Sequence, residues 1–127
     1  MPTDALVTFR DIMNETEAFG FDLAKERQLE LGQRIRNVLE AAGFKSVAAE
    51  GFQAPGVVVS YTDDPAIQNG SKFAANGMQI AAGVPLMCDE GDDYKSFRIG
   101  LFGLDKLKDV DGAVERFETV LSKVLAA

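Results

Sequence analysis

Apolar residues recur at a helical spacing near the start of the chain. Leu6, Phe9 and Met13 follow one another at i, i+3 and i+7, which places them on one face of a helix. Thr3 or Asp4 can cap the start of this helix. The apolar stripe therefore predicts a helix whose face packs into the core.

A second helix is predicted beyond an interruption at Gly20 and Phe21. Asp22 can cap its start, and Gly43 stands where a C-terminal cap belongs. Its apolar stripe consists of Leu31, Ile35, Val38, Leu39 and Ala42. We expect this stripe also to pack into the core.

Strand patterns follow the second helix. Residues 44–49 are a weak candidate, whereas residues 56–61 are β-branched and apolar on both faces, as in a central strand. Residues 78–81 predict a short strand, and residues 96–102 predict the last one.

Two more helices lie among these strands. Asp64 at a cap and Pro65 in the first turn predict a helix that carries Ile67 and Phe73 and ends by residues 76–77. The final helix, residues 109–125, has an apolar face formed by Val110, Val114, Phe117, Leu121, Val124 and Leu125.

The expected order of elements is α-α-β-β-α-β-β-α, without a repeat or a linker. We therefore predict one α+β domain over residues 1–127, with a small mixed or antiparallel sheet of three or four strands covered by helices.

Composition narrows the possible partners. The net charge of −7 disfavours nucleic acid, and the apolar stretches are too short to cross a bilayer. A single cysteine and a start without a basic or apolar leader indicate a cytoplasmic protein. There is no histidine, which removes Ser-His-Asp and Cys-His catalysis as well as histidine-ligated zinc.

One segment nearly matches a calcium-binding EF-hand loop. Positions 3, 5, 6 and 12 of that pattern are occupied by Asp109, Asp111, Gly112 and Glu118. Position 1 is Leu107 instead of a carboxylate, and the helical period continues through the segment. These departures argue against calcium, and we expect no metal site.

An acidic loop spans residues 83–94. Asp89, Glu90, Asp92 and Asp93 are able to hold a hard cation, but carboxylates on such loops are more often simply solvated. Cys88 lies beside two of them, which raises the pKa of a thiol and makes it a poor nucleophile.

Arg98 is the most unusual charged residue, because it stands among Phe97, Ile99 and Leu101. A guanidinium in such surroundings needs a carboxylate or a phosphate to accept its hydrogen bonds. On charge alone, an internal ion pair with Asp or Glu is favoured over an anionic ligand. Lys106, close after the strand, is a second possible anion contact. We assign no catalytic residue.

The strand containing Arg98 resembles the C-terminal end of class V aminotransferases, which are fold-type I enzymes that use pyridoxal phosphate. Within this class the alanine/serine–glyoxylate aminotransferases are the most similar group. The resemblance is carried by residues 97–103 (FRIGLFG) with the helix 109–125, the helix pair 4–20 and 21–43, the strand 54–62, and the glycine turn 79–83.

The resemblance implies that Arg98 binds the α-carboxylate of an amino or keto acid. It also implies that the Schiff-base lysine and the other cofactor-binding groups lie in a large domain absent from this sequence. None of the seven lysines has the cofactor lysine's context: Lys25, Lys45, Lys72, Lys95, Lys106, Lys108 and Lys123.

We therefore expect the small C-terminal domain of a longer transaminase, with Met1 an internal methionine of the parent. Its partners would be the large domain of the same polypeptide and, in the parent, a second subunit of a homodimer. Pyridoxal phosphate would be bound in the parent and not by this chain, which alone would be inactive.

The alternative is a stand-alone, non-catalytic α+β module that binds small carboxylates or mediates subunit association. Apolar residues exposed near Leu101 and Phe102, or along Leu6 and Phe9, would favour the domain of a larger enzyme. A polar surface would favour the module. A purely structural ion pair of Arg98 is compatible with both.

Overall fold

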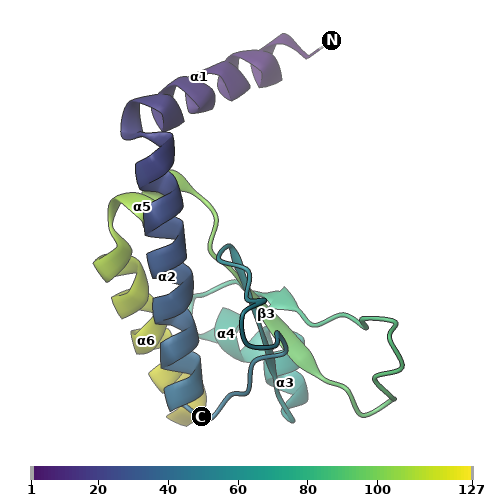
Figure 1. Cartoon of the computed structure of the whole chain (residues 1–127). Helices are drawn as coiled ribbons and strands as arrows, with labels where there is room; N and C mark the ends of the chain where they lie inside the picture. The colour runs from purple at the N-terminus through teal and green to yellow at the C-terminus, as the bar shows by residue number, and fades with distance from the viewer. Residues whose placement is uncertain (1, 127) are drawn as a thin grey trace.

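The computed structural model describes residues 2–126, which form helices around one small sheet (Figure 1). The elements are α1 (Thr3–Phe19), α2 (Phe21–Ala41), β1 (Val57–Tyr61), α3 (Pro65–Gln68), α4 (Ser71–Ala75), β2 (Ala81–Ala82), β3 (Ser96–Gly100), α5 (Leu104–Lys108) and α6 (Val110–Ala126). The strand order is β1-β3-β2, and both pairings are antiparallel. The predicted α+β class, with a small helix-covered sheet, is confirmed.

The core lies between one face of the sheet and the helices. Val58 and Ile99 are direct partners across β1 and β3, and Phe97 follows on the same face. Phe73 of α4 and Phe117 of α6 stack beside them at a ring distance of 6.3 Å. The predicted stripes of α2 and α6 supply most of the remaining core: Leu31, Ile35, Leu39, Val110, Val114, Leu121 and Val124.

The end of α2 has the predicted glycine cap. Gly43 has φ 94°, its amide donates to the carbonyl of Glu40, and the amide of Phe44 donates to that of Leu39. This hydrogen-bond pattern is a Schellman motif, which releases the chain toward the sheet.

The prediction of core packing for α1 is wrong. None of the described α1 residues is buried, and the side chains of Leu6, Phe9 and Met13 are 50%, 63% and 52% exposed. Figure 1 shows α1 leading away from the rest of the molecule beyond the break at Gly20. Its stripe has the right period for a buried face, but no other described element covers it.

Several predicted boundaries differ from the structure. Residues 44–49 form only an isolated bridge, Ser46 to Ser60, since they run beside β1 for a few residues before turning away. The helix predicted after Asp64 is divided into α3 and α4 by Gly70, whose φ is 81°. The short strand is β2, at Ala81–Ala82 rather than at residues 78–81.

The C-terminal elements also differ in detail. β3 ends at Gly100, two residues before the predicted end of the strand, and the unpredicted α5 follows. Asp109 separates α5 from α6 and caps α6, because its Oδ1 accepts a hydrogen bond from the amide of Gly112 at 3.0 Å. The cap gives Asp109 a structural role within the segment that resembles an EF-hand loop.

No helix within residues 2–126 combines the length and the hydropathy required to cross a bilayer.

Candidate functional site

Arg98 lies in the central strand, on the face of the sheet opposite to the core. It is directly paired with Val59 of β1 and Ala81 of β2. Its neighbours Phe97 and Ile99 are buried in the core, so the alternation of the strand turns Arg98 the other way. Arg98 itself is half-buried.

An internal ion pair of Arg98, the option that charge alone favours, is not formed in the part of the chain that the structure describes. Its Nε donates to the carbonyl oxygen of Ala82 at 2.9 Å. The ion pairs formed within residues 2–126 do not include Arg98, and its two terminal nitrogens donate no hydrogen bond there. The guanidinium is thus anchored by one edge, while the other remains available to an anion.

Lys106 is not brought together with Arg98. Its Nζ donates to the carbonyl oxygen of Phe102 at 2.8 Å and lies 3.9 Å from the carboxylate of Asp105. It lines a cavity of about 130 Å³ together with Arg116 and apolar residues, and Arg98 does not line this cavity. The two predicted anion contacts therefore do not form one site.

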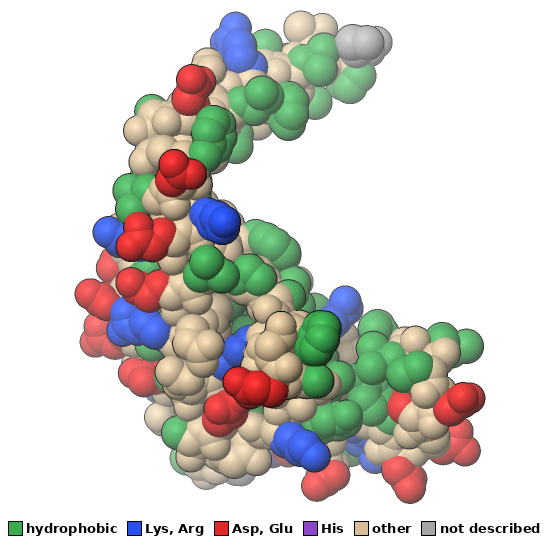
Figure 2. All heavy atoms as spheres, in the orientation of Figure 1, with side chains coloured by type: hydrophobic (Ala, Val, Ile, Leu, Met, Phe, Trp, Pro, Cys, Tyr) green, Lys and Arg blue, Asp and Glu red, His purple; other side chains and the backbone are tan. Residues whose placement is uncertain are grey.

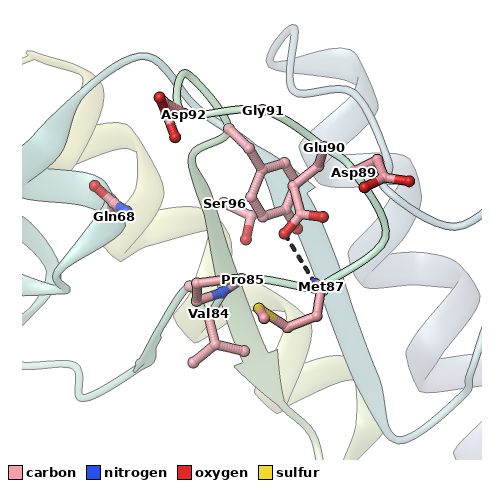
Figure 3. A pocket seen from close by; sticks show the side chains of 11 residues that line it. Gln68, Val84, Pro85, Met87, Asp89, Glu90, Gly91, Asp92 and Ser96 are labelled. Carbon is pink, nitrogen blue, oxygen red and sulfur yellow. Dashed lines mark hydrogen bonds between the residues drawn. The ribbon is translucent and has the colours of Figure 1, made fainter.

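A larger cavity, of about 460 Å³, lies beside the N-terminal end of β3 (Figure 3). The loop of residues 83–94 forms most of its wall. It is lined by Gln68, Gly83, Val84, Pro85, Met87, Asp89, Glu90, Gly91, Asp92, Tyr94 and Ser96. Figure 3 shows Ser96, Pro85, Met87 and Glu90 gathered around one space.

Glu90 organises this loop, a role that the sequence analysis missed. Its carboxylate accepts hydrogen bonds from the amides of Leu86, Met87 and Cys88 at 2.6, 3.0 and 2.8 Å. Hydrogen bonds from backbone amides, first that of Cys88, lower the pKa of Glu90 to about 2. Glu90 therefore remains charged as a structural residue and is not simply solvated.

Two of the residues that line the cavity, Tyr94 and Ser96, carry buried hydroxyl groups. Among residues 2–126, the buried side-chain polar atoms without a hydrogen-bond partner are Tyr94 OH and Ser96 Oγ. The Tyr94 ring packs edge-on against Tyr61, with the ring centroids 5.7 Å apart. No sequence signal distinguished these two hydroxyls, because their burial depends on how the loop folds back over the sheet.

Cys88 lies on the same loop, and the pKa of its thiol is raised, in the predicted direction. It is an exposed free thiol, and its hydrogen bond to Glu90, then desolvation and the charge of Glu90, raise its pKa. A thiol of raised pKa carries little nucleophilic thiolate at neutral pH.

No protein-family model matches this chain, and no curated protein matches it either. Among solved structures, the aspartate aminotransferase of subgroup IV from Thermus thermophilus has a similar fold, with a TM-score of 0.52 and 22% sequence identity. The similar region covers 76% of this chain and 26% of that enzyme. The chain thus shares the fold of a part of an aminotransferase, about a quarter of its length.

Proposed function

We propose that this chain is the small C-terminal domain of a pyridoxal-phosphate-dependent aminotransferase and that Arg98 binds the substrate carboxylate. The substrates would be an amino acid and a small keto acid of the glyoxylate or pyruvate type. Membership of class V, near the alanine/serine–glyoxylate group, is the finer part of the proposal. It rests on the FRIGLFG segment of residues 97–103.

The observation that carries the proposal is the free edge of the Arg98 guanidinium. The bond from Nε to the Ala82 carbonyl orients the planar group, and the two terminal nitrogens donate no hydrogen bond within residues 2–126. A carboxylate accepts two parallel hydrogen bonds from such a group, which fixes the direction of the rest of the substrate. Arg98 is thus proposed as a binding and positioning residue that transfers no proton.

The exposed apolar surface supports the assignment to a larger protein. Leu101 is buried, but Phe102 is 66% exposed, as are large parts of Leu6 and Phe9. Figure 2 shows hydrophobic side chains along the side of α1 that faces the rest of the molecule across open space. A surface of this kind is typical of a face that another domain covers.

The described residues do not fit pyridoxal phosphate on their own. The 460 Å³ cavity is lined by three carboxylates and by no lysine or arginine, and such a lining repels a phosphate. Lys72 is paired with Asp64, and Lys108 with Glu15. We therefore assign the cofactor to the proposed large domain and derive no reaction step on this chain.

Replacement of Arg98 tests the assigned role. We expect Arg98→Lys to weaken pyruvate binding by about tenfold or more, since lysine does not form the planar two-point contact. Binding is measured by NMR titration of the 127-residue chain with pyruvate at constant ionic strength. Arg10→Lys, a change on exposed α1, is the matched control and should leave the affinity unchanged. Equal affinities of the Arg98→Lys variant and the unmodified chain would contradict the role.

The size of the native polypeptide separates the proposal from the stand-alone module. An antibody against this domain should detect, in the source cell, a species much heavier than these 127 residues. Its cofactor lysine can then be trapped with borohydride. A native species of only this size would leave the carboxylate-binding module as the better assignment.

A further inference from the structure

We propose that the cavity enclosed by residues 83–94 and the start of β3 binds a small organic ammonium ion. The site is separate from Arg98, which does not line the cavity, and its ligand has the opposite charge to a substrate carboxylate. The inference therefore does not depend on the proposed function.

The first argument is the pair of unpartnered hydroxyls. Ser96 is 1% exposed, and Ser96 Oγ and Tyr94 OH have no hydrogen-bond partner among the described residues. A buried polar group without a partner is costly, and such groups in folded proteins usually mark a missing ligand or water. Each hydroxyl oxygen accepts hydrogen bonds, so a ligand rich in N–H donors satisfies both.

The second argument is the charge of the cavity. Asp89, Glu90 and Asp92 line it, whereas no lysine or arginine does. The backbone amides that would attract an anion are already bonded to the Glu90 carboxylate. The lining therefore favours a cation and disfavours an anion.

The third argument distinguishes an organic cation from a metal ion. Residues 2–126 contain no group of three or more acidic, histidine or cysteine side chains placed to hold a metal. One wall of the cavity is formed instead by Val84, Pro85 and Met87, which suit a short hydrocarbon segment. An ammonium group with a small carbon body matches the hydroxyls, the carboxylates and this wall together.

The two sides of the cavity differ in how closely they are packed. A Cβ on Gly83 would lie 1.8 Å from the carbonyl oxygen of Ser96, so this side is closely packed against β3. The loop side is open, because Met87 is 88% exposed. Since the two hydroxyls are covered, the ligand reaches them when the loop shifts outward, and we expect the loop amides to respond to binding.

The test is an NMR titration of the 127-residue chain with 1,4-diaminobutane at constant ionic strength. We expect saturable shifts of the amides of Tyr94, Ser96 and the loop, with no comparable change for 1-butanol, which lacks the charge. Tyr94→Phe and Asp92→Asn should each weaken binding by about tenfold, as expected for a lost hydrogen bond to a charged group. Asp22→Asn, which removes a carboxylate from α2, should leave the affinity unchanged.

Other outcomes would overturn the proposal. Equal shifts with sodium chloride would show general screening of charge, and tighter binding of Ca²⁺ would show a metal site. If the Tyr94→Phe variant is folded, as judged by its thermal transition, and its affinity is unchanged, then the Tyr94 hydroxyl does not bind the ligand. A folded Ser96→Ala variant provides the same test for the second hydroxyl.

Discussion

At the scale of single residues, two arginines, Arg36 on a helix and Arg98 on a strand, have different surroundings. Arg36 of α2 is 5% exposed and donates to the carbonyl oxygens of Ala54 and Val57 at 2.8 and 3.3 Å. Burial lowers its pKa. Arg98 lies on the face of the sheet opposite to the core, and its terminal nitrogens donate no hydrogen bond within residues 2–126. The apolar neighbours of Arg98 in the sequence therefore do not describe its surroundings, because strand alternation turns Arg98 away from them.

Glu90 supports a prediction about pH. Its pKa of about 2 is below the ordinary value of 4.5, so it stabilises the loop fully above pH 4.5. This contribution is lost as the pH falls from 4.5 toward 2. We expect the amide resonances of Met87 and Cys88 to titrate with a midpoint near 2 in NMR spectra, and Glu90→Gln to abolish this titration. A midpoint near 4.5 would contradict the assigned hydrogen bonds.

At the scale of elements, capping residues and glycines in the sequence predicted where helices begin and break more accurately than they predicted how long the helices and strands are. Asp64 does cap α3, with its Oδ1 accepting from the amide of Ala66 at 2.8 Å, and Gly20 does separate α1 from α2. The division of the next helix at Gly70 and the extra helix α5 were missed. Both are short turns of helix whose ends depend on contacts with the sheet and α6, which periodicity does not report.

The close approach of β2 and β3 predicts different effects at two glycines. Gly83→Ala should reduce the free energy of unfolding by about 1–3 kcal/mol, because the new Cβ would overlap the Ser96 carbonyl. Gly100→Ala, on the same sheet, is the control, because a Cβ added at Gly100 would have no atom within 4 Å apart from those of Gly100 and its two chain neighbours. This change should alter the free energy of unfolding by less than about 0.5 kcal/mol. Urea unfolding measures both, and equal effects would contradict the packing described.

At the scale of the whole molecule, stability is unevenly distributed. The helices α2, α4 and α6 share one core with the sheet, whereas α1 contributes no buried residue among those described. A helix with little tertiary packing is only marginally stable in water. The end of the chain that carries α1 is therefore the part of this fold that most needs a covering partner.

Two phenylalanines test this distribution. Phe117→Ala, at a site 3% exposed, should reduce the free energy of unfolding by about 3–5 kcal/mol. Phe9→Ala, at a site 63% exposed, should change it by less than about 0.5 kcal/mol in the 127-residue chain. Thermal or urea denaturation provides the measurement. A large effect of Phe9→Ala would mean that α1 is packed in solution.

The sequence by itself determined the α+β class, the two long N-terminal helices with their break, a strand near residues 56–61 and the position of Arg98 on a strand. These follow from periodicity, β-branching and caps, which act within a few residues along the chain. That the strand of Arg98, β3, is the central one, and the strand of residues 57–61 an outer one, was decided by the tertiary structure. Only the tertiary structure decided which apolar stripe is buried, which arginine is enclosed and where the loop hydroxyls of Tyr94 and Ser96 lie. These features depend on segments distant in sequence, whose contacts no local pattern encodes.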